Sequence, residues 1–465
     1  MILEILADIT GLKFLFLFAF VLLLSWLTYK VVEEKLSPLQ RIPCPPGALP
    51  LIGHLVTLFR SGGFLKMIRI WTEQYPSLFI VHPGFGIGIG GYMVYVSDPE
   101  LIRFVTVKNP HKFERTKFVS LVVPSISKGL FVAVGKAHAR QKRIIGPAFS
   151  SANLQGFLGI FLENSKNLVK HWGNQLKKHE HSIDIELLDD LSHLTLDVIG
   201  QTAFGYNFNT ILAGESKVSR AFATVSHALD FKYLICKFLI PYFDYLPLAV
   251  NKKLQIAKEI SDDIVLKVFT FILAGNETTS VSMAWTLYEL AKNPQIQETL
   301  RMEIEAAFPD EEELTWEKLD KLQYLENVVK ESLRLHPPGD ITARVALLDV
   351  EIGGYFVPAG TYIILPIDAM QRCSSFWPDS EKFNPKRFEE NDEQSSTHSY
   401  TYFPFGCGPR KCIGYKFALM EMKVVIATLV KKFSFSEVPG CVVKEVNKGT
   451  TQPDGLKLRI ATIQT

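Results

Sequence analysis

The stretch FGCGPRKCIG, residues 405–414, places two cysteines five positions apart among glycines, a proline and two basic side chains. Glycine has no Cβ, so such a loop lets the backbone approach a flat ligand closely. The following segment, residues 415–433, has the apolar spacing of a helix. The positive end of that helix, together with backbone N–H groups, favours a thiolate placed just before it. The sequence therefore predicts a thiolate ligand in this loop.

Cys412 is the cysteine with the better surroundings for a thiolate. Arg410 supplies a cation two residues away, and Phe405 can shield the sulfur from water. Cys407 is expected to be a small buried filler. The complete pattern would arise by chance in roughly one chain in ten thousand of this length. Its fixed positions are Phe405, Gly408, Arg410, Cys412 and Gly414.

This pattern, F-x-x-G-x-R-x-C-x-G, resembles the haem-binding signature of the cytochrome P450 superfamily. In that family a cysteine thiolate is the axial ligand of the haem iron, and Cys412 stands at the ligand position. Cys407 lies at a variable position of the motif. The resemblance implies that the residues of the pattern bind haem b, iron protoporphyrin IX.

A second motif, AGNETTS, occupies residues 274–280 in a long apolar helix expected over 261–293. Gly275 thins this helix, and the Thr278 hydroxyl can bond back to the backbone and distort the ladder. On its own, the AGNETTS motif is best interpreted as part of an ordinary buried helix with a tolerated glycine. The motif also resembles the family motif [AG]-G-x-[DE]-T-[TS]. The resemblance implies that Glu277 and Thr278 form a proton relay for oxygen activation.

A third motif is KESLRLHPP, in which Glu331 and Arg334 share a helix face. Alone such a pair is usually exposed and nearly neutral in energy. The motif resembles the family's E-x-x-R, and FNPKRF, residues 383–388, resembles its partner segment. The resemblance implies a buried network of Glu331, Arg334 and Arg387 with a structural role.

The two haem propionates require nearby cations or other donors. Arg344 resembles a propionate ligand of the family. Where the family often has W-x-x-x-R, this chain has His138 and Lys142, which are still donors to a carboxylate. A lysine is less directional than an arginine in this role. A basic surface patch is the alternative interpretation of the segment that contains them.

The N-terminal segment of residues 14–29 carries no charge and has a lysine at each flank. A cleaved signal peptide is the alternative, but the preceding residues are not basic overall and charged residues follow directly. We predict a transmembrane anchor over 1–35, a stiff proline-rich hinge over 36–54 and a haem-thiolate catalytic domain over 55–465. More basic residues follow the anchor than precede it, so the catalytic domain should face the cytosol.

The composition agrees with a single large enzyme domain. The 465 residues show no linker and no repeat, and the net charge of +2 argues against nucleic acid as a partner. Six scattered cysteines without a CxxC pair indicate a reduced compartment and no structural zinc. Helical spacing over about 150–335, a hairpin at 78–98 and strand-like pieces at 343–366 predict a mainly α fold with a minor β part.

The resemblance covers the chain from the anchor to about residue 436. It implies a microsomal haem-thiolate monooxygenase of the endoplasmic reticulum membrane, which inserts one oxygen atom into a lipophilic substrate. It also implies a flavoprotein partner of the NADPH-cytochrome P450 reductase type, with cytochrome b5 as a further candidate. A peroxide-rearranging relative is one alternative, against which Glu277 and Thr278 argue. A non-catalytic or poorly active haem-binding isoform is the other.

One departure from the family lies before the central helix. There the family has a long helix, a short helix and a loop, whereas here residues 242–260 run directly into Ser261. Several helical turns that roof the substrate site are therefore expected to be absent. Residues 240–250 are equally consistent with buried core and with a loop that dips into a membrane.

The sequence also indicates where a substrate would bind. Residues 119–134 and 339–343 are mostly apolar and are expected to line the pocket. Within them, Asp340 is expected either to pair with a polar or cationic group or to cap a turn.

Overall fold

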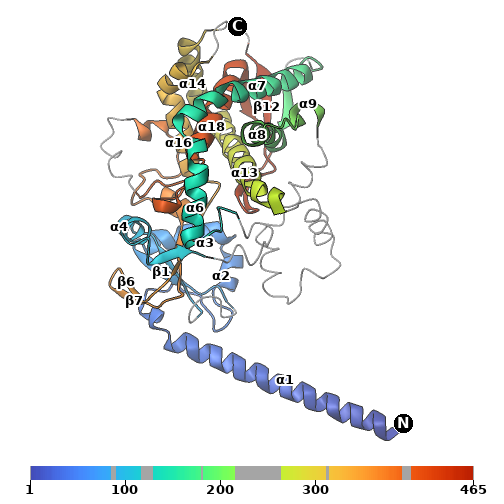
Figure 1. The fold of residues 1–465 in the computed structure, drawn as a ribbon, viewed down its shortest axis with the longest axis vertical. Coiled ribbons are helices and arrows are strands. Elements are labelled where there is room, and N and C mark those ends of the chain that lie inside the picture. Colours follow the sequence, from blue (N-terminus) through green and yellow to red (C-terminus); the bar gives the residue numbers. More distant parts are fainter. Residues whose placement is uncertain are drawn as a thin grey trace. The chain divides into compact units, whose positions relative to one another are not determined.

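The computed structural model describes residues 2–84, 91–116, 129–179, 182–214, 263–309, 314–389 and 400–463, with the backbone alone over 2–16 and 263–273. The chain forms two compact units. Unit 1 is Met1–Arg115 with Ile341–Cys373, and unit 2 is Thr116–Asp340 with Ser374–Thr465. The prediction of a mainly helical chain with a minor sheet part is confirmed (Figure 1).

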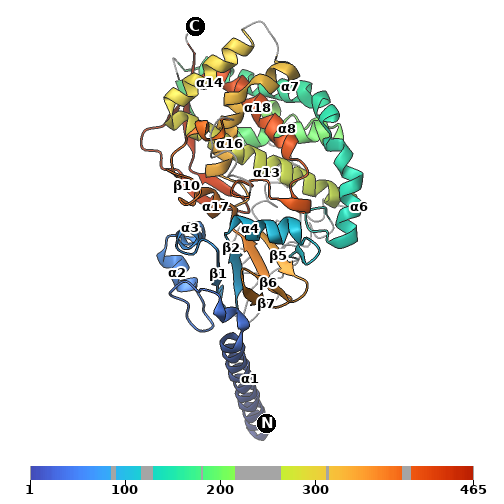
Figure 2. The same cartoon turned by 90° about the vertical axis from the view of Figure 1, so that its left-hand side faces the viewer.

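A five-stranded sheet in the order β1-β2-β8-β5-β3 forms the centre of unit 1 (Figure 2). Its strands are β1 (Leu78–Val81), β2 (Met93–Val96), β3 (Phe113–Arg115), β5 (Thr342–Ala346) and β8 (Tyr362–Leu365). β1 and β2 pair antiparallel, so the hairpin predicted over 78–98 is confirmed. β2 pairs in parallel with β8, with Val94 opposite Ile363. Residues 341–373 therefore complete a sheet that begins near the N-terminus, and the predicted domain 55–465 is shared between the two units.

Unit 1 also contains helices and a small hairpin. They are α1 (Ile2–Leu36), η1 (Pro38–Arg41), α2 (Leu55–Arg60), α3 (Phe64–Gln74), α4 (Pro99–Arg103), the π-helical turn η2 (Phe104–Lys108), β6 (Val350–Ile352), β7 (Tyr355–Val357) and α17 (Ile367–Arg372). Apolar residues of α3 pack with the sheet and α17 in one buried cluster, which includes Trp71, Phe79 and Ala369. Asp98 caps α4, because its Oδ1 accepts a hydrogen bond from the Leu101 N–H at 2.9 Å.

The N-terminal helix α1 is 35 residues long. Its described apolar side chains are largely exposed, among them Leu17, Phe18, Phe20, Leu22 and Trp26. Over the residues that the structure describes, no single helix combines the length and hydropathy needed to cross a membrane. One pair of helical segments, Gly135–Phe149 and Ser151–Leu176, has the required length and hydropathy when taken together, but it is bent by 58°. The anchor over 1–35 stays a prediction.

Residues 36–54, expected to be a stiff extended spacer, belong to unit 1 and are bonded to β1 and to the residue after it. Ile42 is buried. The Ile80 N–H of β1 donates to the Pro43 carbonyl at 2.9 Å, and the His54 N–H donates to the His82 carbonyl at 2.8 Å. These bonds satisfy backbone groups at the sheet edge, which explains why the segment does not stand free.

Unit 2 is built from helices. They are α6 (Gly135–Ile145), η4 (Gly146–Phe149), α7 (Ser151–Leu176), α8 (Leu187–Phe204), α9 (Thr210–Ala213), α13 (Asp263–Lys292), α14 (Pro294–Ala307), α15 (Trp316–Lys321), α16 (Gln323–Leu335), η6 (Pro385–Phe388), η8 (Gly408–Arg410) and α18 (Tyr415–Lys432). The long helix predicted over 261–293 corresponds to α13, while residues 261 and 262 lie outside the described residues. α8 ends at Gly205, whose φ of +63° is the left-handed conformation that glycine adopts without strain.

Two small sheets complete unit 2. One has the order β4-β12-β9, and the other pairs β10 with β11. The strands are β4 (Ser182–Glu186), β9 (Phe433–Glu437), β10 (Lys444–Asn447), β11 (Thr451–Asp454) and β12 (Lys457–Thr462).

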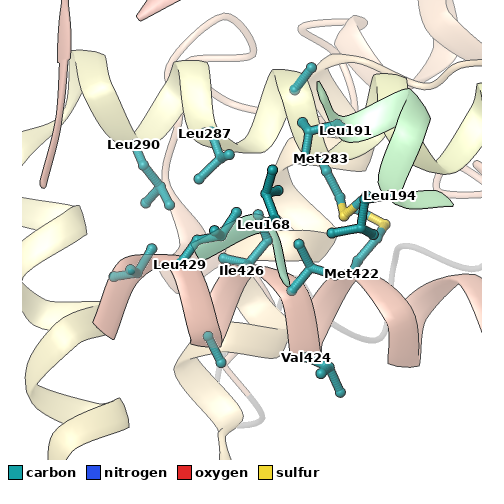
Figure 3. Packing of buried hydrophobic residues seen from close by; sticks show 14 of the residues in the cluster. Leu168, Leu191, Leu194, Met283, Leu287, Leu290, Met422, Val424, Ile426 and Leu429 are labelled. Carbon is teal, nitrogen blue, oxygen red and sulfur yellow. The ribbon is translucent and has the colours of Figure 1, made fainter. Parts of the chain in front are cut away.

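The core of unit 2 lies where α7, α8, α13 and α18 meet. Figure 3 shows Leu168, Leu191, Met283 and Ile426 converging from these four helices. All four are fully buried, with no more than 1% of their surface exposed. Burial of each such side chain contributes about 1.5–3 kcal/mol of transfer free energy. The core therefore fixes α13 and α18, the two helices that carry the predicted chemical motifs.

Candidate functional site

The loop that carries Cys412 joins η8 to the first turn of α18. Gly406 and Gly408 have φ values of +69° and +67°, a region that favours glycine. The Cys412 N–H donates to the Phe405 carbonyl at 2.9 Å, which closes the loop. Cys412 then lies three residues before Tyr415, the first residue of α18. The backbone thus holds this cysteine at the N-terminal end of a helix.

The two cysteines of the loop differ in exposure. The Cys412 side chain is exposed, whereas Cys407 is partly buried. Cys407 immediately precedes η8, with an extended backbone at φ −142°. Because the N-terminal end of a helix favours a thiolate, the exposed thiol of Cys412 is the better placed ligand.

Basic side chains of unit 2 bind the backbone around this loop. Arg410 Nη1 donates to the Ala133 carbonyl at 2.6 Å. Lys142 Nζ, on α6, donates to the Pro409 carbonyl at 2.6 Å. The structure therefore brings Arg410 and Lys142 together at the Cys412 loop. His138 lies one helical turn before Lys142 on α6 and is partly buried.

The motif of residues 274–280 lies within α13. Thr278 Oγ1 donates to the Ala274 carbonyl at 2.5 Å, the back-bond expected from the sequence. A Cβ placed on Gly275 would lie 3.2 Å from Ile199 Cδ1 of α8. The space beside Gly275 is therefore filled by α8. The small size of this glycine allows the two helices to pack closely on that side.

Glu277 is held by two residues that sequence reasoning missed. Its Oε1 accepts hydrogen bonds from Thr450 Oγ1 at 2.7 Å and from Gln452 Nε2 at 3.0 Å. Thr450 directly precedes β11 and Gln452 lies within it, more than 170 positions further along the chain than Glu277. No local pattern in the sequence could have indicated this contact.

The pair of Glu331 and Arg334 is completely buried on α16, with 0% of either side chain exposed. Arg334 Nε and Nη2 donate to the two carboxylate oxygens at 2.7 and 2.8 Å. Arg387 Nε donates to Glu331 Oε1 at 3.2 Å, and the Asn384 N–H donates to the same oxygen at 2.9 Å. The carboxylate therefore opposes two guanidinium groups.

Backbone carbonyls complete the coordination of the two arginines. Arg334 Nη1 donates to Ser380 O at 2.7 Å, and Arg387 Nη2 donates to Asp379 O at 2.7 Å. The Arg334 guanidinium also lies 5.2 Å from the centre of the Trp377 ring. The network joins α16 to the loop before η6.

The remaining candidates are more scattered. Arg344 lies on β5 of unit 1, is 5% exposed, and donates to Thr342 Oγ1 at 3.1 Å and to the Ala343 carbonyl at 2.9 Å. Asp340 is buried and accepts a hydrogen bond from Asn447 Nδ2 at 2.8 Å, so it pairs with a polar group. Residues 119–128, the larger part of the expected pocket segment 119–134, lie outside the described residues, as do 240–250.

Comparison with known proteins decides the family. The family model described as "Cytochrome P450" matches residues 43–267 and 261–460. The chain belongs to the cytochrome P450 family. It is 30% identical to "Cytochrome P450 3A12" of Canis lupus familiaris over 437 residues, with 84% of each chain covered. It is 31% identical to "Cytochrome P450 4c21" of Blattella germanica over 487 residues, with 93% of this chain and 94% of the relative covered.

The family match is split at the place where the sequence predicts a shortened stretch. Its two parts overlap at residues 261–267. The alignment with the Blattella germanica relative spans 487 positions, more than the 465 residues of this cytochrome P450, so the relative contains residues that this chain lacks. The position of the missing segment, before Ser261, stays a prediction.

Membership of this family makes the chain a haem-dependent monooxygenase, an oxidoreductase that binds iron protoporphyrin IX. The residues present fit that group. The Cys412 thiol is exposed at a helix N-terminus and is a soft sulfur ligand of the kind that haem iron accepts. Among the described residues, a Cβ placed on Gly406 meets no atom within 4 Å, so the loop leaves open space beside it.

Proposed function

We propose that this cytochrome P450 is a membrane-anchored monooxygenase of lipophilic compounds that receives electrons from an NADPH-dependent flavoprotein reductase. The observation that carries the proposal is the exposed Cys412 thiol, held by a closed loop at the N-terminus of α18. When bound, haem supplies the activation of dioxygen and the insertion of one oxygen atom into the substrate.

In this proposal the loop residues bind and orient the haem. Cys412 is the thiolate ligand of the iron, and Phe405 limits the access of water to the sulfur. Gly408 and Gly414 leave room for the flat macrocycle. In unit 2, Arg410, His138 and Lys142 are the donors to propionate. For Arg344, in unit 1, the same role follows from the resemblance to the family.

Glu277 and Thr278 deliver protons in the proposed mechanism. Glu277 is partly buried and hydrogen-bonded on α13, and Thr278 is the next residue. A carboxylate beside a hydroxyl can accept a proton from water and pass it on. The Glu331–Arg334–Arg387 network has a structural role in this proposal, because it holds α16 against the segment before η6.

The exposed apolar surface of α1 supports a membrane anchor. Side chains such as Phe18, Leu22 and Trp26 are about half exposed to solvent, an arrangement that water does not favour. Basic residues after this segment place the catalytic part in the cytosol, on the endoplasmic reticulum membrane. Cytochrome b5 is a further candidate electron donor.

The test is reconstitution of the full chain in lipid vesicles with a flavoprotein reductase. Lipophilic compounds are first screened by the shift that they cause in the haem spectrum. Those that bind are then incubated with NADPH, and product and oxygen consumption are measured. The proposal predicts an oxygenated product that requires both NADPH and reductase. Product formed from organic peroxides without NADPH would indicate a peroxide-rearranging enzyme instead, and haem binding without turnover of any ligand would indicate a non-catalytic isoform.

A further inference from the structure

The segment around the hairpin of β10 and β11 contacts Glu277 from outside the helix that carries it. Glu277 and Thr278 are neighbours on α13, and side chains at i and i+1 of a helix do not face each other. Adjacency in the sequence therefore does not orient the carboxylate toward the hydroxyl. Something outside the helix has to fix the Glu277 side chain.

Thr450 and Gln452 meet this requirement. Thr450 directly precedes β11 and Gln452 lies within it, and both side chains contact the Glu277 carboxylate. Thr450 Oγ1 donates to Glu277 Oε1 at 2.7 Å and accepts from Gln452 Nε2 at 3.1 Å. Gln452 Nε2 also approaches the same carboxylate oxygen at 3.0 Å. A hydroxyl that donates and accepts in this way belongs to a polarised chain, which strengthens its bond to a carboxylate.

Thr450 is held in place by its burial and by the contacts of the next residue. It is 7% exposed. The next residue, Thr451, makes two backbone hydrogen bonds. Its N–H donates to Pro338 O at 3.0 Å, and its carbonyl accepts from Trp285 Nε1 at 2.9 Å. Trp285 belongs to the same helix as Glu277, about two turns further along. The strand is therefore attached to α13 at two levels.

Other contacts fix the rest of the hairpin. Asn447 Nδ2 donates to Asp340 Oδ2 at 2.8 Å. On β10, Glu445 Oε1 lies 3.2 Å from His336 Nδ1. His336 in turn lies 3.0 Å from Glu289 of α13 and is stacked on the Trp285 ring at 3.9 Å. These contacts make the hairpin a rigid support on which a precise donor can be placed.

We propose that Thr450 and Gln452 are positioning residues that hold the Glu277 carboxylate in the orientation needed for proton delivery. This inference rests on the proposed role of Glu277. Without the Thr450 hydroxyl, Glu277 would occupy other rotamers, and the proton would arrive less often where it is needed. We expect a loss of about tenfold in the rate of product formation, the value of a charge-assisted hydrogen bond.

The experiment compares Thr450→Val, which removes the hydroxyl at constant shape, with Thr450→Ser, which keeps it. Gln452→Leu tests the second donor. If the Thr450→Val variant does not fold, Gln452→Leu becomes the decisive variant. Thr299→Val is the matched control, because the Thr299 hydroxyl bonds within α14 to Gln295 O at 2.9 Å. Glu277→Gln reports whether the carboxylate acts in proton delivery at all.

Each holoenzyme is assayed for haem content, thermal midpoint, and peroxide and product formed per NADPH. Hydrogen exchange of the backbone amides over 274–280 is a second readout, independent of turnover. We expect Thr450→Val and Gln452→Leu to release more peroxide per NADPH and to exchange faster over 274–280, at normal haem content. Thr450→Ser should restore both, and Thr299→Val should match the wild type.

Two results would overturn the inference, and they differ. If Glu277→Gln diverts electrons to peroxide while Thr450→Val and Gln452→Leu do not, the carboxylate acts but the hairpin does not position it. If Glu277→Gln itself leaves the product per NADPH unchanged, the proposed role of Glu277 fails, and the inference fails with it.

Discussion

Replacement of Glu331 by Gln should destabilise the protein far more than the same change elsewhere on α16. The Glu331 carboxylate has no exposed surface and opposes the buried guanidinium groups of Arg334 and Arg387. An amide removes the negative charge while nearly preserving the shape. Two buried cations are then left without their common anion.

The size of the effect follows from this geometry. Breaking a buried ion pair by removing one partner costs about 3–5 kcal/mol. For a chain of 465 residues the entropy of unfolding is about 1 kcal/mol per kelvin, so the midpoint should fall by about 3–5 °C. Glu326→Gln is the control, because its side chain lies on the same helix, is 34% exposed, and pairs with Lys330 at 2.7 Å and with Lys423 at 3.3 Å. Partly exposed pairs of that kind are worth about 0.2–1 kcal/mol each.

The assay is urea unfolding of wild type, Glu331→Gln and Glu326→Gln, followed by tryptophan fluorescence and by haem retention. Trp377 lies over the Arg334 guanidinium and should report directly on the network. The two variants should differ by at least about 1 kcal/mol. Equal unfolding free energies would show that the carboxylate does not hold the two arginines, and the structural role proposed for the network would be lost.

Three further changes test other parts of the molecule. Burial raises the pKa of Glu421 well above its ordinary value. The protein should therefore lose about 1.4 kcal/mol of stability per pH unit as the pH rises above ~4.3 toward the folded-state pKa. Glu421→Gln should remove this slope, and wild type and variant having parallel plots of unfolding free energy against pH would contradict the prediction. Thr278→Ala should keep haem but release more peroxide per NADPH, because the proton relay is weakened, and an unchanged ratio would exclude Thr278 from the mechanism. A helical segment inserted between Ile260 and Ser261, which lie outside the described residues, should improve haem retention, thermal midpoint and coupling by excluding water, and equal behaviour of the two chains would show that no roof is missing.

The parts of the fold that could be predicted are those with a local signal. β-Branched residues interspersed with glycines predicted the hairpin of β1 and β2, and helical spacing predicted α13. A period of two residues reveals which face of a strand is buried but not which strand is its neighbour. The pairing of β2 with β8 and of β3 with β5 joins segments more than 200 residues apart, so the division of the chain into two units could not be predicted.

The same limit applies to the candidate site. The i, i+3 spacing of Glu331 and Arg334 made their contact predictable, whereas the carbonyls that complete the network belong to an irregular loop. The partners of Glu277 lie 173 and 175 residues away, on a hairpin whose sequence carries no recognisable motif. The close contact of Gly275 with α8 could not be predicted, because the sequence does not show which helix packs beside a glycine.

The central claim is that Cys412, and not Cys407, is the ligand of the haem iron. The most direct measurement is the absorption spectrum of the reduced carbon monoxide complex of Cys412→Ala and of Cys407→Ala, each purified at known haem content. We predict that Cys412→Ala loses the thiolate-type absorption and that Cys407→Ala keeps it, because the exposed thiol at the N-terminus of α18 is that of Cys412. Loss of that absorption in Cys407→Ala, with its retention in Cys412→Ala, would contradict the assignment of the site.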